Sequence, residues 1–261
     1  MTPVFVGEVA LVTGAGRGIG RAIALELAAA GARVALLARS ADQLEEAARA
    51  VRGRGGRAAV YPADAADPAQ VADAVTRITA ELGQVGILVG NAAVVRPVGP
   101  TVDVTLAEWW AAFAVNVGAV FQLSIAVLPS MLERGWGRIV NVSSGAAADP
   151  AAMVRGNTYT TTKAALEAHT LNLAAELAGS GVTANVYRPG LVDTAMQAWI
   201  RAQSPEKIGG AMYERFVGHY QDGSLITAEQ SARSLMRHLA SDATGQIWNA
   251  NSNRPMQQMK G

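Results

Sequence analysis

The chain has 261 residues, of which 50% are hydrophobic and 16% charged, with a formal net charge of +1 and no cysteine. This composition supports a large packed core, and the near-neutral charge excludes an extended basic surface for nucleic acid. Without cysteine there is no disulfide and no cysteine-ligated zinc site.

Short apolar runs alternate along the chain with longer amphipathic segments, a pattern typical of β-α units. The runs carry few polar residues, so we expect strands that are covered on both faces. The predicted strands are Val9 to Thr13, Arg33 to Ala38, Ala58 to Tyr61, Ile87 to Val89, Arg138 to Val142, Thr183 to Tyr187 and Ile247 to Asn249. A single α/β domain over residues 1–261 follows, with a doubly wound, Rossmann-like parallel sheet of about seven strands and helices on both faces.

Polar residues three apart mark the starts of several helices, because an N-cap side chain and its partner satisfy two free amides reciprocally. The predicted capping boxes are Ser40 with Gln43, Thr105 with Glu108 and Thr227 with Gln230.

Residues 191–224 interrupt the alternation, since they are too long for an ordinary connection. They carry apolar side chains at helical spacing: Met196, Trp199, Ile200, Met212, Tyr213, Phe216, Val217 and Tyr220. We expect a substrate lid here, and packing against the body or a neighbouring subunit is the alternative.

A glycine-rich turn directly follows the first predicted strand and opens a helix. Gly14, Gly18 and Gly20, with Ile19 between the last two, allow the backbone to approach a pyrophosphate at the helix N-terminus. The strand-turn-helix context favours a dinucleotide site over a turn without a ligand. No Gly-Lys-Ser/Thr follows, so a P-loop is excluded.

The end of the second predicted strand indicates which dinucleotide binds. NAD sites place an acid there and NADP sites place an arginine, and here the residues are Ala38 and Arg39. Arg17 in the glycine turn is a second candidate for the same phosphate. The pair predicts NADP(H), and two solvated surface arginines are the alternative.

Tyr159 and Lys163 are four residues apart, so they share one helical face. A free tyrosine has a pKa of ~10, which a nearby ammonium lowers toward a value useful for acid-base chemistry. Ser143 and Ser144 end the fifth predicted strand, where ligands of open α/β sheets bind.

Taken together, these motifs resemble the short-chain dehydrogenase/reductase family from about Val9 to about Gln246. The matching segments are Thr13-Gly14-x-x-x-Gly18-x-Gly20, Asn91-Ala92, Asn116-Val117-x-Ala119, Ser143-Ser144, Tyr159-x-x-x-Lys163, Pro189-Gly190-x-Val192-x-Thr194 and Thr244-Gly245-Gln246. The resemblance implies that Tyr159 donates a proton to the substrate oxygen and that Lys163 lowers its pKa and binds the nicotinamide ribose. It assigns the orienting hydroxyl to Ser144, with Ser143 as the alternative.

Other roles also follow from the resemblance alone. Asn116 is expected to hold a water for proton relay, and Asn91 to lie beside the cofactor. Asp64 is expected to contact the adenine. The nicotinamide side is expected to be formed by Pro189, Val192 and Thr194.

The family also implies a function and an assembly. We expect an NADPH-dependent carbonyl reductase or secondary alcohol dehydrogenase acting on a small molecule, without a metal, as a homotetramer or dimer. A catalytically silent NADP(H)-binding redox sensor is the alternative, and a methyltransferase or a serine hydrolase is a weaker one.

Several features depart from the family pattern. Gly90 stands where an asparagine is usual and Arg188 precedes Pro189 where asparagine is common, and residues 247–261 lack the usual ending. No signal peptide or membrane span is predicted, and a cytoplasmic location is expected.

Overall fold

The computed structural model describes residues 4–250. Its centre is a seven-stranded sheet in the order β3-β2-β1-β4-β5-β6-β7, in which each neighbouring pair is parallel. The strands are β1 (Val9–Thr13), β2 (Arg33–Ala38), β3 (Arg57–Pro62), β4 (Val85–Gly90), β5 (Gly137–Val142), β6 (Val182–Arg188) and β7 (Ile247–Asn249). The order reverses beside β1, so the expected doubly wound sheet is confirmed.

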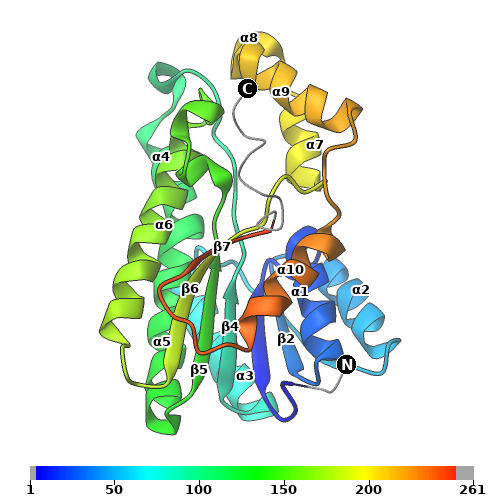
Figure 1. Cartoon of the computed structure of the whole chain (residues 1–261), viewed down its shortest axis with the longest axis vertical. Coiled ribbons are helices and arrows are strands. Elements are labelled where there is room, and N and C mark those ends of the chain that lie inside the picture. Colours follow the sequence, from blue (N-terminus) through cyan, green and yellow to red (C-terminus); the bar gives the residue numbers. More distant parts are fainter. Residues whose placement is uncertain (1–3, 251–261) are drawn as a thin grey trace.

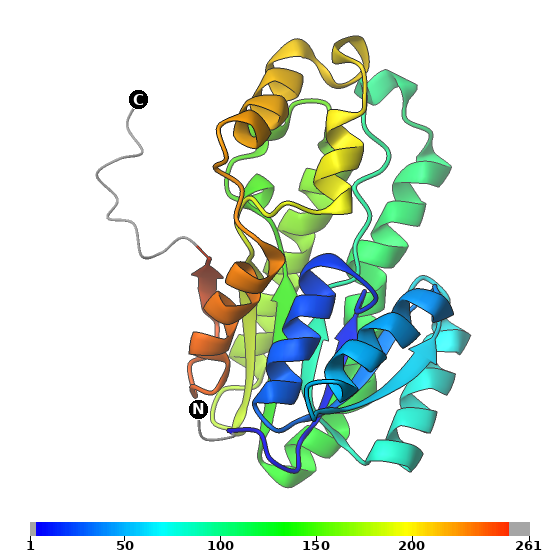
Figure 2. The ribbon, with the colours of Figure 1, turned by 90° about the vertical axis from the view of Figure 1, so that its right-hand side faces the viewer.

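Helices cover both faces of the sheet (Figures 1 and 2). The buried clusters place α1, α2 and α10 on one face and α3, α5 and α6 on the other. The bounds are α1 (Gly18–Ala29), α2 (Ala41–Arg52), α3 (Pro68–Leu82), α4 (Leu106–Phe113), α5 (Ala119–Arg134), α6 (Asn157–Glu176), α7 (Ala195–Arg201), α8 (Pro205–Ile208), α9 (Gly210–Gln221) and α10 (Ala228–Leu239).

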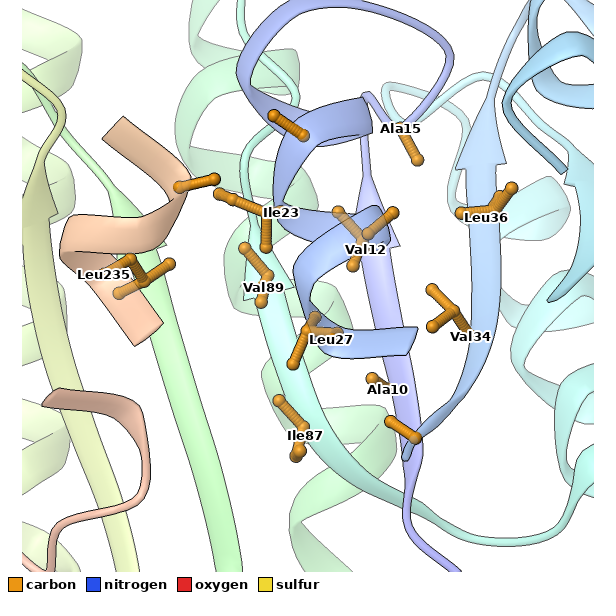
Figure 3. Close-up of a cluster of buried hydrophobic side chains, with 14 of the residues drawn as sticks. Ala10, Val12, Ala15, Ile23, Leu27, Val34, Leu36, Ile87, Val89 and Leu235 are labelled. Carbon is orange, nitrogen blue, oxygen red and sulfur yellow. The ribbon is translucent and has the colours of Figure 1, made fainter. Parts of the chain in front are cut away.

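Apolar runs become strands because the sheet interior is dry on both sides. In Figure 3, Ile23 and Leu27 of α1 lie over Val12 of β1 and Val89 of β4, with Leu235 of α10 beside them. All five side chains are essentially inaccessible to solvent. Burying each such side chain contributes about 1.5 to 3 kcal/mol, so this layer fixes α1 and the turn before it against the sheet.

Two of the three predicted capping boxes are present, at Thr105 with Glu108 and at Thr227 with Gln230. At the third, Ser40 accepts from the Gln43 amide, but no reciprocal bond forms. The Gln43 side chain packs instead against the glycine turn, 2.9 Å from where a Cβ at Gly16 would lie.

The helical segment Leu106–Arg134 has one face without a partner. Its most apolar window has a mean hydropathy of 2.0 and is 39% buried, and by length and composition it is the one candidate membrane span in the described chain. The exposed apolar side chains include Leu106, Trp110, Phe121 and Ile125. The opposite face packs on the sheet through residues such as Leu123 and Val127.

Helices α7, α8 and α9 stand above the carboxyl ends of the strands (Figure 1). We call residues 195–221, which hold these three helices, the cover. The segment leaves and rejoins the body at one point, where Val192 pairs with Ile226 in a parallel bridge. The Asp193 amide donates to the Ile226 carbonyl at 3.0 Å, and the Ile226 amide to the Leu191 carbonyl at 2.9 Å.

Candidate active site

A cleft of about 730 Å³ lies between the carboxyl ends of the strands and the cover. Its volume falls within the usual range for small-molecule and cofactor sites. Most of the residues predicted from the sequence line it: Gly14, Arg17, Gly18, Ile19, Gly20, Arg39, Asp64, Asn91, Tyr159, Lys163, Pro189 and Thr194.

The glycine turn is closely packed against the loop that follows β4. A Cβ at Gly20 would lie 2.5 Å from the Asn91 side-chain nitrogen, and one at Gly14 would lie 2.8 Å from the same atom. Gly14 and Gly18 also have φ of 63° and 54°, which favours glycine. Helix α1 has no side-chain N-cap and no acid in its first turn. Its first amides are therefore available to an anion in the cleft, which is what a pyrophosphate requires.

Thr13, at the end of β1, ties this turn to the end of β4. Its hydroxyl oxygen accepts from the Asn91 and Ala92 amides, both at 2.9 Å. The Asn91 side chain returns a bond to the Thr13 carbonyl at 2.9 Å. Asn91 therefore shapes the cleft through the backbone as well as lining it.

Arg17 and Arg39 lie at one end of the cleft, together with Ser40 and Gln43. Both arginine side chains are exposed, and within residues 4–250 neither makes a hydrogen bond or an ion pair through its guanidinium. Asp64 lines the same end, where its carboxylate accepts from the Ala66 amide at 3.0 Å. Two uncompensated guanidinium groups at this end suit a phosphate.

Tyr159 lies at the other end of the cleft, on the first turn of α6. Burial raises the pKa of its phenol, and a hydrogen bond with the Ser144 side chain opposes that rise. The expected lowering of the Tyr159 pKa by Lys163 is wrong for this structure. The ammonium nitrogen lies 5.9 Å from the centre of the phenol ring. Lys163 is not among the groups that shift the Tyr159 pKa, and burial is the largest cause of its rise. Tyr159 is thus held as a neutral acid.

Lys163 is buried one turn along α6, and its ammonium donates to the Val142 carbonyl at 2.7 Å. Burial lowers the pKa of Lys163 to about 8, and the negative charge of Glu167 opposes that fall. The ammonium therefore binds the end of β5, at the edge of the cleft.

A buried polar network lies below Lys163. The Ser143 hydroxyl donates to Glu167 at 2.7 Å, and Arg188 donates to both carboxylate oxygens of Glu167, at 2.8 and 2.7 Å. Arg188, which departs from the family pattern, is held in position by this network. We call α6 and the ends of β5 and β6 the floor of the cleft.

The network also gives the two candidate hydroxyls, on Ser143 and Ser144, different environments. The Ser143 hydroxyl lines the cleft but is taken by Glu167. Ser144 is not among the residues that line the cleft, but its side chain is near enough to the Tyr159 phenol to lower the Tyr159 pKa. The geometry therefore favours Ser144 over Ser143 as the hydroxyl that acts with Tyr159.

Asn116 lies outside the cleft, fully buried in a π-helical turn over Ala114–Gly118. Its side-chain nitrogen donates to the Val94 carbonyl and to the Thr162 hydroxyl, both at 2.9 Å, and its oxygen accepts from the Val94 amide at 2.8 Å. π-Helical turns are often found at functional sites. Here the turn lets one side chain join α6 to the loop after β4.

Val192 also lies outside the cleft, because it is buried in the bridge with Ile226. Gly90 is explained by Asn141, since a Cβ at Gly90 would lie 2.5 Å from the Asn141 side-chain oxygen. The cleft residues that the sequence analysis did not predict as site residues include Gln43 and Arg96. Among residues 4–250, no group of three or more histidine, aspartate or glutamate side chains is arranged to hold a metal ion.

Comparisons with known proteins agree with this geometry. The family model described as short chain dehydrogenase matches residues 8–205. The chain is 37% identical over 245 residues to the 3-oxoacyl-(acyl-carrier-protein) reductase FabG of Pseudomonas aeruginosa, covering 94% of each protein.

Two solved structures share the fold and differ in cofactor. An actinorhodin polyketide ketoreductase variant with NADPH is 30% identical, with a TM-score of 0.84 and 95% and 97% of the two chains covered. A xylitol dehydrogenase with bound NAD⁺ is 27% identical, with a TM-score of 0.84 and coverage of 94% and 98%. Both dinucleotides therefore occur among the structural relatives.

Proposed function

The chain belongs to the short chain dehydrogenase family, and on that premise we propose that it reduces the carbonyl group of a small molecule with NADPH. Its membership makes it an oxidoreductase that interconverts alcohol and keto groups. One observation carries the narrower proposal: Tyr159, Lys163 and the glycine turn line one cleft, with two free arginines at the far end.

The choice of NADPH rests on Arg17 and Arg39. Among the described residues that line the cleft, Asp64 is the one acid, and it is engaged with its own turn. A 2′-phosphate would meet two guanidinium groups, whereas a free ribose hydroxyl would find no carboxylate at the end of β2. The free amides of α1 would hold the pyrophosphate.

The chemistry follows from the protonation states. NADPH supplies the hydride, and the chain supplies position and a proton. Tyr159 stays protonated because it is buried, and so it can donate to a carbonyl oxygen near neutral pH. Ser144 orients the phenol, while Lys163 places a positive charge at the edge of the cleft. These roles suit reduction better than oxidation.

Replacement of Tyr159 by phenylalanine tests this assignment. We expect turnover of ketones and aldehydes, followed by NADPH absorbance, to fall by about 10²- to 10⁴-fold, because the acid is lost. NADPH binding, followed by fluorescence titration, should persist. Tyr220→Phe, on the exposed side of the cover, is the matched control. Undiminished turnover in Tyr159→Phe would refute the role, and cofactor binding without turnover in the wild type would favour a redox sensor.

Replacement of both Arg17 and Arg39 by alanine tests the cofactor. Charge-assisted hydrogen bonds are worth about 1.5 to 3 kcal/mol each, so NADPH affinity should fall by at least about 100-fold. NADH affinity should change little. Arg54→Ala, on an exposed arginine outside the cleft, is the control. An equal loss for both dinucleotides would contradict NADPH preference.

The cover and the exposed helical face complete the proposal. We infer that residues 191–224 act as a substrate lid, since Met196 and Trp199 of α7 line the cleft. We also infer that the apolar face of Leu106–Arg134 joins subunits of a homo-oligomer and does not span a membrane, since its other face packs on the sheet. A dimer or tetramer fits that face equally, and a cytoplasmic location stays a prediction.

A further inference from the structure

Two cavities meet at a single pair of side chains. The cleft adjoins a smaller cavity of about 270 Å³ between the loop after β4 and helices α7 and α8, which we call the outer pocket. Of the described residues, Arg96 and Trp199 line both. A substrate that reaches from the cleft toward the outer pocket must therefore pass this pair.

Arg96 is held in place by Trp199. Its guanidinium carbon lies 4.3 Å from the centre of the indole ring. Trp199 is half-buried and packs against the apolar cluster that contains Tyr159 and Val95. Stacking covers one face of a guanidinium and leaves its edge donors free. Within residues 4–250, those donors make no hydrogen bond or ion pair, so Arg96 is a positioned cation with unused donors.

Arg96 is exposed to solvent and lies between an apolar wall of the cleft and a charged outer pocket. The cleft wall beside it is apolar, formed by Val94, Val95 and Met196. The remaining charged residues of the cleft belong to the cofactor end and to the floor. On the cleft side, a positioned cation beside a neutral wall would hold an anionic group.

The outer pocket itself is unsuited to an anion. Beyond Arg96 it is lined by Asp103, Glu108 and Lys207. Hydrogen bonds from Thr105 lower the pKa of Glu108, and the nearby charge of Lys207 lowers it further. The charge of Lys207 thus faces a carboxylate of the same pocket. An anion is therefore expected to stop at Arg96, at the boundary between the two cavities.

We propose that Arg96, held by Trp199, is a specificity-determining residue that binds the carboxylate of a keto acid whose carbonyl lies at Tyr159. The substrate class is then an organic acid with an apolar or aromatic spacer between its two ends. This inference rests on the proposed carbonyl reduction, because it assumes that the reacting oxygen lies at Tyr159.

Matched acids and esters test the inference. The probes are para-acetylbenzoate and levulinate, each compared with its methyl ester, with kcat and KM measured with NADPH. We expect kcat/KM to favour at least one acid over its ester by about 10-fold or more, since the ester lacks the charge. Arg96→Ala should lower kcat/KM for that acid by about 10- to 150-fold, mainly through KM, and leave the ester unchanged.

Two variants serve as controls. Lys207→Ala removes the other cation of the outer pocket and should preserve the preference for the acid. Arg96→Lys keeps the charge and should restore part of the preference. The affinity of Arg96→Ala for NADPH should equal that of the wild type, which separates substrate binding from cofactor binding.

Binding of the same acids, measured by calorimetry with NADP⁺ present, separates the inference from the proposed function. If neither acid nor ester turns over but an acid binds through Arg96, the proposed function fails and the anion site stands. Equal kcat/KM for acid and ester in the wild type, or an equal loss for both in Arg96→Ala, overturns the anion site. Absence of both turnover and acid binding also overturns it.

Discussion

The ends of β5 and β6 are tied to α6 by buried polar side chains. Helices α7, α8 and α9 above them are attached by apolar packing, by an ion pair, and by hydrogen bonds that Arg155 and Arg215 donate to backbone carbonyls. In the floor, Arg188 and Glu167 are 17% and 10% exposed. In the cover, Arg201 is 14% exposed, but its partner Asp193, 3.3 Å away, is 53% exposed. Pairs of the first kind are costly to break, and those of the second contribute little. The site therefore combines a rigid base with a weakly attached cover.

The largest effect is expected from Glu167→Gln. It leaves Arg188 buried without a counter-charge, and breaking a buried pair by removing one partner costs about 3 to 5 kcal/mol. Chemical unfolding of the full chain measures the loss. Glu176→Gln, on an exposed residue of the same helix, should change stability by less than about 0.5 kcal/mol. If both variants behave alike, the floor is not the more strongly coupled region.

The pH dependence of reduction sharpens the same contrast. The pKa of Lys163 is lowered from 10.5 to about 8, mainly by burial, so the ammonium loses its charge as pH rises through about 8. We expect kcat/KM for reduction to fall above that pH. Because the charge of Glu167 raises the Lys163 pKa, Glu167→Gln should move the fall to lower pH. If kcat/KM falls at the same pH in Glu167→Gln as in the wild type, the charge of Glu167 does not raise the Lys163 pKa.

The contribution of Lys163 to the free energy of unfolding changes with pH in the opposite direction to kcat/KM. Between about pH 8 and 10.5 the unfolded lysine binds its proton and the folded one does not, so the contribution of Lys163 to stability rises with pH there. Other groups also titrate in this range. The comparison of wild type with Lys163→Met isolates the contribution of this lysine.

The smallest effect is expected from Arg201→Ala in the cover. Arg201 stacks at 4.1 Å on Tyr220, which is 55% exposed, and pairs with Asp193. Contacts with an exposed partner contribute about 0 to 1 kcal/mol each, so global unfolding should shift by about 2 kcal/mol or less. Hydrogen exchange should quicken within residues 195–221 and stay unchanged in β5 and β6. Faster exchange throughout the sheet would show that the cover is not a separate unit.

The sequence predicted the fold because its signals are local. Buried parallel strands appear as apolar runs, and all seven predicted strands lie within the observed ones. The glycine turn and the Tyr159–Lys163 pair are local patterns too, and the structure brings them to one cleft.

The floor could not be predicted in the same way. Ser143, Glu167 and Arg188 lie on three different elements, and only the pairing of β5 with β6 and the packing of α6 bring them together. The Tyr159 pKa was misjudged for a related reason. Sequence spacing shows that an ammonium is near, but it does not show how deeply the phenol is buried.

Because Val192 and Ile226 pair in a parallel bridge, the chain between them forms a loop that is closed at its base. Since lengthening a closed loop adds only about 0.6 kcal/mol for each doubling, this stretch can be exchanged for one of another length with little penalty. A segment of another length could thus be grafted at this junction while the glycine turn and α6 stay intact.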